Sequence, residues 1–103
     1  MTEYVLVLTT FPEDGADTLA IALVEERLAA CVNVLEPMRS IYRWKGRVET
    51  ALERQVVIKT RAANVAALEV RVTALHPYDV PEFLVLAIEG GSHAYLAWLG
   101  EST

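Results

Sequence analysis

Apolar and polar residues alternate with a period of two along residues 48–60, and this is the most regular pattern in the chain. One face of this segment carries Val48, Thr50, Leu52, Arg54, Val56, Ile58 and Thr60, and the other carries mostly charged or polar residues. A two-residue period predicts a half-buried β-strand. The preceding residues 31–44 are also rich in β-forming types, and Lys45-Gly46 lies between the two segments. Because glycine adopts positive φ at no steric cost, residues 31–61 are predicted to form one long β-hairpin.

The predicted hairpin is long for a chain of this size. An arm of about fourteen residues extends roughly 45 Å, whereas a domain of about 100 residues has a radius of gyration near 13 Å. The arms should therefore project from the core, with Ile41, Tyr42 and Trp44 near the tip. Exposed apolar strands promote aggregation of a monomer, so we expect the hairpin to serve assembly. Pro37 cannot donate a ladder hydrogen bond, which predicts a bulge or bend in the first arm.

The remaining segments alternate between strand and helix patterns. Apolar runs predict strands at residues 4–10, ended by Phe11-Pro12, and at residues 83–88. Helical spacing of apolar residues predicts helices at residues 15–29 and from residue 64 to His76-Pro77, and a short last helix closed by Gly100. The predicted N-caps of these helices are Asp14, Asn64 and Ser92.

The predicted order βαββαβ, followed by a terminal helix, is that of the ferredoxin-like α+β fold. Right-handed crossovers place both main helices on one face of the sheet. The opposite face has no cover from its own chain, although the strands are apolar on both sides. Another subunit is the simplest cover, which agrees with the expectation from the hairpin.

Composition narrows the class of protein. The 103 residues fit one domain, residues 1–103, and 53% of them are hydrophobic, enough for a core. The net charge is −5 and no basic run is present, so we expect no nucleic-acid partner. No apolar run is long enough to predict a membrane span. The acidic N-terminal segment lacks the basic start of a secretory signal, which favours a cytoplasmic protein.

His76 carries the clearest candidate chemistry. It ends a predicted helix and is followed by Tyr78, Asp79 and Glu82. One imidazole and two carboxylates within seven residues are donors for a divalent metal ion. The alternative is a histidine that hydrogen-bonds the last helix carbonyls. The spacings of closed zinc sites are absent from the sequence.

Two further groups of residues have alternative interpretations. Cys31 is interpreted as a small buried side chain, with ligation of a soft metal as the alternative. Tyr42, Arg43, Trp44 and Lys59 mark a possible pocket between subunits, although the two aromatic residues also suit interface anchors. Motifs for a nucleophile elbow, a Walker loop or a dinucleotide fingerprint are absent from the sequence.

Five segments together resemble the CutA divalent-ion-tolerance proteins. These are ERLAACVNV (26–34), SIYRWKGRVE (40–49), VIKT (57–60), HPYDVPE (76–82) and YLAWL (95–99). The resemblance covers nearly the whole chain, in order. It implies a ferredoxin-like subunit in a tight homotrimer, with long hairpins packed between neighbours. It also implies a cytoplasmic protein linked to tolerance of copper and other divalent metals.

The resemblance carries over to individual residues only in part. Some members of the family are credited with a copper site formed by a cysteine late in the first strand and a His-His pair. Here these positions hold Thr9 and Leu75-His76, so His76 is the one strong metal ligand that is retained. The positions that match the family's cleft between subunits are Tyr42, Trp44, Lys59, His76, Tyr78 and Glu82.

Several functions follow as hypotheses. The leading one is a trimeric metal-binding protein that uses the loop after His76. The second is a signalling or adaptor trimer, similar to PII-type proteins, which binds a small molecule or a partner in its clefts. The third is an enzyme, for which Lys59, His76 and Glu82 are the candidate acid-base groups. A purely structural trimer with incidental metal affinity is the fourth.

Overall fold

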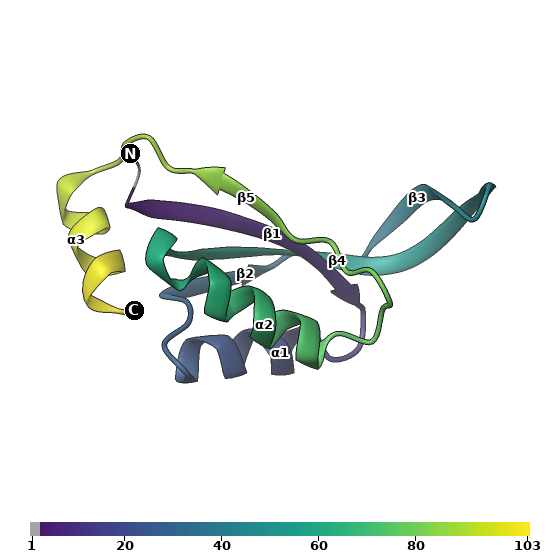
Figure 1. Ribbon diagram of the computed structural model, residues 1–103, viewed down its shortest axis with the longest axis horizontal. Coiled ribbons are helices and arrows are strands. Elements are labelled where there is room, and N and C mark those ends of the chain that lie inside the picture. The colour runs from purple at the N-terminus through teal and green to yellow at the C-terminus, as the bar shows by residue number, and fades with distance from the viewer. Residues whose placement is uncertain (1–2) are drawn as a thin grey trace.

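An antiparallel sheet of five strands forms the centre of the structure, a computed structural model that describes residues 3–103 (Figure 1). The strand order is β2-β4-β1-β5, and β3 continues the hairpin with β4. The elements in chain order are β1 (Tyr4–Pro12), α1 (Ala16–Glu25), β2 (Cys31–Val34), β3 (Met38–Trp44), β4 (Arg47–Arg61), η1 (Ala62–Asn64), α2 (Val65–Leu75), β5 (Leu84–Ala87) and α3 (His93–Glu101). The predicted ferredoxin-like α+β fold is confirmed.

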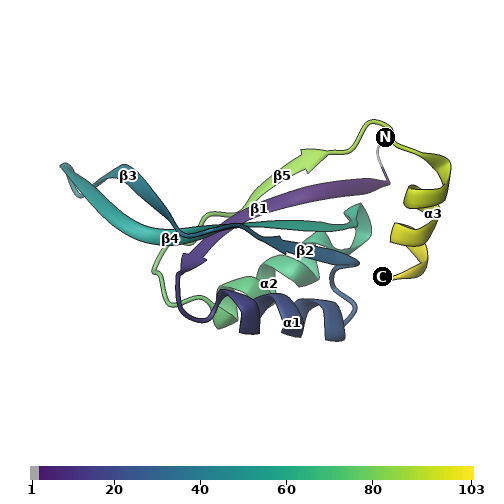
Figure 2. The same ribbon diagram turned by 180° about the vertical axis from the view of Figure 1, so that it is seen from behind.

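Helices α1 and α2 cover one face of the sheet (Figures 1 and 2). Alternate residues of β1 and of the inner part of β4 point toward them, as their two-residue period requires. The resulting core contains Val5, Val7, Leu19, Leu23, Val56, Ile58, Leu68 and Val72. Burial of these side chains against the two helices is the main source of stability within one chain.

Several predicted boundaries and caps differ from the structure. Strand β1 does not end before Phe11-Pro12 but runs through Pro12, which lies opposite Glu53 of β4. Helix α1 ends earlier than predicted, at Glu25, and its N-cap is Gly15 with φ 98° rather than Asp14. Glycine suits that position because other residues rarely adopt such a φ. Ser92 caps α3 as predicted, accepting from the Tyr95 amide.

The predicted turn of the hairpin is confirmed. Lys45 and Gly46 both have positive φ, at 50° and 78°, as a type I′ turn requires. Trp44 faces Arg47 across the turn. The outer part of the hairpin, formed by β3 and the start of β4, projects beyond the rest of the sheet (Figure 1), and the molecule measures 44 × 25 × 24 Å.

A one-residue bulge separates β2 from β3. Val34 pairs with Val56 and Met38 pairs with Glu53, so three residues of the first arm lie opposite two of β4. The Leu35 amide still donates to the Gln55 carbonyl, at 3.0 Å. The irregularity that Pro37 predicts is therefore present, and it reverses the face to which alternate side chains of the first arm point.

The face of the sheet opposite α1 and α2, here called the open face, carries no helix over its strands within the described residues (Figure 2). Strand β5 lies at one edge, and its apolar side chains remain exposed, with Leu84 at 54%. Helix α3 packs at the end of the sheet, where Arg61 donates to the Gly100 carbonyl at 2.7 Å. The expectation that this chain leaves the open face uncovered is thus met.

Candidate functional site

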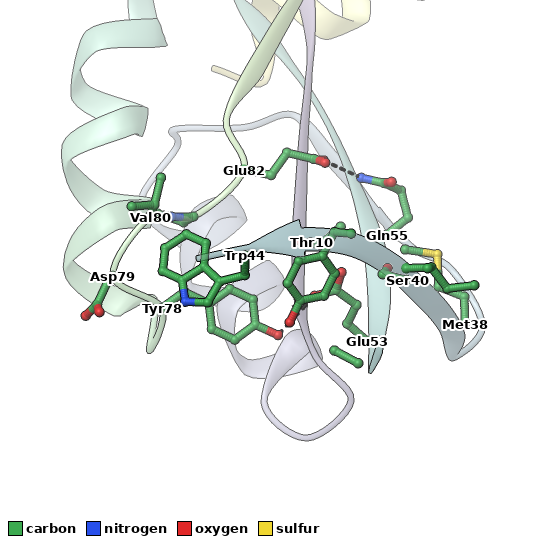
Figure 3. A pocket seen from close by; sticks show the side chains of 14 residues that line it. Thr10, Met38, Ser40, Trp44, Glu53, Gln55, Tyr78, Asp79, Val80 and Glu82 are labelled. Atoms are coloured by element: carbon green, nitrogen blue, oxygen red, sulfur yellow. Dashed lines mark hydrogen bonds between the residues drawn. The ribbon is translucent and has the colours of Figure 1, made fainter. Parts of the chain in front are cut away.

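A pocket of about 700 Å³ lies between the hairpin, along β3 and residues 51–55 of β4, and the loop of residues 78–82 (Figure 3). We call it the hairpin pocket. Of the six residues that match the family's cleft, four line this pocket, namely Tyr42, Trp44, Tyr78 and Glu82. Its volume lies within the usual range for sites that bind small molecules.

The bulge at residues 35–37 places the aromatic residues of β3 in this pocket. In β2, odd-numbered residues such as Cys31 pair with odd-numbered residues of β4, whose side chains point to the open face. After the bulge, Tyr42 pairs with Glu49 and Trp44 with Arg47, so even-numbered residues point to that face instead. Without the extra residue, Tyr42 and Trp44 would point to the opposite side of the hairpin.

Glu53 and Tyr78 form a partly buried hydrogen bond at one side of the pocket. The Tyr78 hydroxyl donates to Oε2 of Glu53 at 2.9 Å, and Glu53 is only 6% exposed. Burial, the hydrogen bond to Glu53 and the negative charge of Glu53 raise the pKa of Tyr78 to about 12. Tyr78 therefore stays protonated and remains a donor over the physiological range of pH.

Gln55 joins the far end of the loop to the sheet. Its side-chain amide donates to Oε2 of Glu82 at 2.9 Å (Figure 3). The same amide donates to the Thr9 carbonyl at 2.8 Å. Glu53 and Gln55 are two positions apart in β4, so their side chains share a face. Strand β4 thus holds the loop at both ends, through Tyr78 and through Glu82.

His76 fixes the start of the loop. It is buried, its Nε2 lies 2.6 Å from the Thr10 carbonyl, and its Nδ1 accepts from the Tyr78 amide at 3.2 Å. A carbonyl can only accept, so Nε2 carries the proton and the ring is neutral. The ring also packs edge-on against Phe11, with centroids 4.8 Å apart. His76 therefore bonds a strand carbonyl, not the helix carbonyls of the alternative interpretation.

Lys59 does not line the hairpin pocket of one chain, and its place in a cleft between subunits stays a prediction. It lies six positions beyond Glu53 in β4, about 20 Å along an extended strand. Its Nζ is 5.8 Å from the ring centroid of Tyr95 in α3. The alternation of β4 places Lys59 on the same face as Glu53, so it could not show which of the two lies near the loop. Cys31, opposite Lys59, is half-buried on the open face rather than fully buried.

Glu53 and Gln55 are the site residues that the sequence did not identify. Both are polar positions on the less apolar face of a predicted strand, which is where solvent-facing residues are expected. Their role depends on the pairing of β4 with β1, which brings Pro12 opposite Glu53 and Thr10 opposite Gln55. That register places the end of β1, and with it His76 and the loop, beside them.

The described residues do not assemble a metal site within one chain. No group of three or more histidine, cysteine, aspartate or glutamate side chains among residues 3–103 is arranged to hold a metal ion. Both ring nitrogens of His76 are engaged, so coordination by His76 would first break a hydrogen bond. Within the same residues, no helix is both long and apolar enough to cross a membrane.

The fold and the pocket define a ferredoxin-like α+β domain with a projecting hairpin and a candidate ligand cleft. The family model described as "CutA1 divalent ion tolerance protein" matches residues 5–102. The chain therefore belongs to the CutA1 divalent ion tolerance protein family, as the five sequence segments predicted.

Known relatives agree with this assignment along the whole chain. A divalent-cation tolerance protein CutA from Thermus thermophilus is 48% identical over 101 residues, which cover 98% of each chain. A solved structure of the Cut A1 protein from Thermus thermophilus matches with a TM-score of 0.94 at 50% identity, covering 97% of this chain and 98% of the other. The structure of CutA1 from Oryza sativa matches with a TM-score of 0.95 at 42% identity, covering 99% of this chain and 94% of that one.

Proposed function

We propose that this protein is a cytoplasmic homotrimer that binds divalent cations, copper among them, and acts in tolerance of these ions. The observation that supports assembly is the apolar surface that one chain leaves exposed. Leu84, Val85 and Leu86 of the edge strand β5 are exposed, and so are Ile41, Val48 and Leu52 of the projecting hairpin. Exposed edges and apolar strands of this kind favour association.

Two parts of the chain have a strand edge that no other described strand pairs with. Among residues 3–103, strand β5 pairs only with β1, and the outer part of β4 pairs only with β3. Each presents backbone hydrogen-bonding groups and apolar side chains without cover from the described residues. Packing of these parts against neighbouring copies would pair the free backbone groups and cover the apolar side chains. A closed ring then leaves no exposed edge to which further chains could bind.

A metal site in this proposal combines residues from more than one chain, because residues 3–103 of one chain do not assemble it. His76 supplies the imidazole once its hydrogen bond with Thr10 or Tyr78 is released, and imidazole is a preferred ligand of copper. Glu53 and Glu82, which line the hairpin pocket nearby, are the oxygen donors. Harder divalent cations would rely on these carboxylates rather than on His76.

Assembly is tested by a charge on the open face. We expect Leu84→Glu to convert the trimer into smaller species, because the carboxylate would be buried in the interface without a partner. Val70→Glu is the matched control, since Val70 of α2 is also an exposed apolar residue. Sedimentation velocity would measure both variants. An unchanged trimer for Leu84→Glu would contradict assembly through this face.

Metal binding is tested by the two histidines of the chain. We expect the wild-type trimer to bind copper with one ion per chain and His76→Ala to lose that stoichiometry in native mass spectrometry. His93→Ala is the matched control, because His93 is exposed at the start of α3. Equal copper uptake by the His76 variant and the wild type would show that His76 is not a copper ligand.

A second candidate function is suggested by the hairpin pocket itself. Its volume and the gathering of Tyr42, Trp44, Tyr78 and Glu82 suit a small-molecule ligand, as in a PII-like signalling or adaptor trimer. A thermal-shift screen of nucleotides, amines, acids and metal ions would test it. A ligand that stabilises the wild type but not Trp44→Ala supports this candidate, and a screen without any such ligand rejects it.

The cytoplasmic location stays part of the proposal. The names of relatives give different cellular locations: one from Arabidopsis thaliana is called chloroplastic and one from Archaeoglobus fulgidus is called periplasmic. Fractionation of the native host, with antibodies against this chain, would decide it. Recovery outside the cytoplasmic fraction would contradict the location that we propose.

A further inference from the structure

The charges around the hairpin pocket all have one sign. Glu53, Asp79 and Glu82 are among its lining residues, and none of the lining residues is a lysine, an arginine or a histidine. The ion pairs formed within residues 3–103 are Arg61 with Glu3 and Arg71 with Glu26, so neither Glu53 nor Glu82 has a cationic partner there. In Figure 3 the Asp79 carboxylate points outward, which leaves Glu53 and Glu82 as the inner acidic groups.

Glu53 is the most informative of these groups because it is more than nine-tenths buried. Tyr78 donates to its Oε2, whereas the hydrogen bonds among the described residues give its Oε1 no donor. A buried carboxylate usually has a positive partner, because loss of hydration is costly for an isolated charge. Oε1 of Glu53 keeps some solvent-accessible surface, so it can accept a hydrogen bond from water or from a ligand in the pocket.

Aromatic and soft apolar groups form the other walls. Tyr42 and Trp44 from β3 and Tyr78 from the loop line the cavity together with the Met38 thioether (Figure 3). Tyr42 and Trp44 are partly exposed, so their ring faces are accessible to a ligand in one chain. Aromatic faces attract cations, most strongly those with apolar substituents that lose little hydration.

We propose that the hairpin pocket binds an organic ammonium ion, with Glu53 and Glu82 as counter-ions and the aromatic rings around its alkyl groups. This inference rests on the second candidate function, because it names the ligand class of the same pocket. Two carboxylates in a pocket whose lining residues in one chain include no basic side chain disfavour an anionic ligand. The aromatic walls and the size of the cavity distinguish an organic cation from a bare metal ion, which needs several donors at short range.

The experiment uses the trimer as purified and two probes of the same shape. Choline carries a quaternary ammonium group, and 3,3-dimethylbutan-1-ol replaces its nitrogen by carbon. In a Trp98→Phe background Trp44 is the only tryptophan, so its fluorescence reports on the pocket. We expect choline to change this emission and to bind at least about tenfold more tightly than the alcohol.

Variants assign the contributions of charge and ring. Glu53→Gln keeps an acceptor for Tyr78 but removes the charge, and we expect choline affinity to fall about tenfold. Trp44→Ala should lower affinity about fivefold by calorimetry, whereas Trp44→Phe should retain most of it. Glu69→Gln is the matched charge control, because Glu69 is exposed on α2 and does not line the pocket. Its affinity should equal that of the wild type.

Each other result overturns the inference in a recognisable way. If the alcohol or acetate binds in the pocket as tightly as choline, the cationic class is wrong and the small-molecule function stands. If no probe binds at millimolar concentration and acrylamide does not quench Trp44 in the trimer, a second copy fills the pocket. The ammonium-ion inference and the small-molecule function are then both wrong. If Glu69→Gln weakens binding as much as Glu53→Gln, the attraction comes from net charge and not from this site.

Discussion

The two halves of β4 have the same alternating pattern but different surroundings. In the inner half, residues 53–61, Val56 and Ile58 are fully buried, and β1 and the first hairpin arm flank the strand. In the outer half, residues 47–52, the strand pairs only with β3, and Leu52 is 63% exposed. The pattern identifies an apolar face in both halves. Helices of the same chain cover that face in the inner half, and we propose that other chains cover it in the outer half.

The largest expected effect on the free energy of unfolding distinguishes the inner half of β4 from its outer half. Ile58→Ala should lower the free energy of unfolding by about 3–4 kcal/mol, because it leaves a cavity between the sheet and both helices. Leu52→Ala is the matched change on the same face of β4, and we expect it to act on association rather than on folding of the chain. Urea unfolding at two protein concentrations would measure both. Equal losses that do not vary with concentration would contradict the comparison.

The next effect concerns the link between β1 and the loop. His76→Phe keeps a ring against Phe11 but removes both hydrogen bonds of the imidazole, so we expect a loss of about 2 kcal/mol in the free energy of unfolding. His93→Phe, at an exposed position, should change it little. Chemical denaturation would compare them. A neutral His76→Phe would show that the link to the Thr10 carbonyl contributes nothing to stability.

Removal of the Tyr78 hydroxyl should have a smaller effect. Tyr78→Phe takes the donor away from Glu53, and the buried carboxylate then lacks its hydrogen bond. We expect a cost of about 1–2 kcal/mol at neutral pH. Tyr95→Phe is a suitable control, because the described hydrogen bonds do not use its hydroxyl. Equal stability of the two variants would mean that the bond between Tyr78 and Glu53 is not formed in solution.

The same tyrosine predicts a dependence on pH. Its pKa is raised to about 12, above its ordinary value of 10, so its contribution is complete below pH 10 and is lost as the pH rises toward 12. Tyr78 is 37% exposed, and with solvent screening we expect about 1 kcal/mol. The difference in stability between wild type and Tyr78→Phe should therefore shrink between pH 9 and pH 12. A constant difference would contradict the raised pKa.

The smallest effect belongs to the turn. Gly46→Ala should destabilise the hairpin by about 1 kcal/mol or less, because φ is 78° at Gly46 and a Cβ is unfavourable there. Gly90→Ala is the control, since a Cβ at Gly90 would meet no atom within 4 Å. Thermal unfolding would show whether only the first variant has a lower midpoint. A lower midpoint for both would assign the effect to something other than φ.

Much of this fold was predictable because local chemistry determines it. The alternation of β4, the turn at Lys45-Gly46 and the irregularity at Pro37 each follow from neighbouring residues. The end of β1 was not predictable in the same way: Phe11 and Pro12 extend the strand because β4 continues beside them. The pairing partner, which lies far away in the sequence, overrides the local signal there.

The candidate site was predictable only where its residues lie in recognisable segments. Tyr42, Trp44, Tyr78 and Glu82 come from two such segments, and the structure brings them together. Glu53 was not identified, and Lys59 was grouped with residues whose pocket it does not reach within one chain, for one reason. Both occupy the same face of β4, and only the register with β1 shows which end of that face adjoins the loop.

Native mass spectrometry of the purified wild-type protein at near-neutral pH, before and after addition of Cu²⁺, is the most direct test of assembly through the outer hairpin and β5. We expect a trimer at micromolar concentration, with smaller species only for variants such as Leu84→Glu. A stable folded monomer of the wild type at that concentration would contradict it, because the apolar hairpin and β5 would then remain in water without a partner.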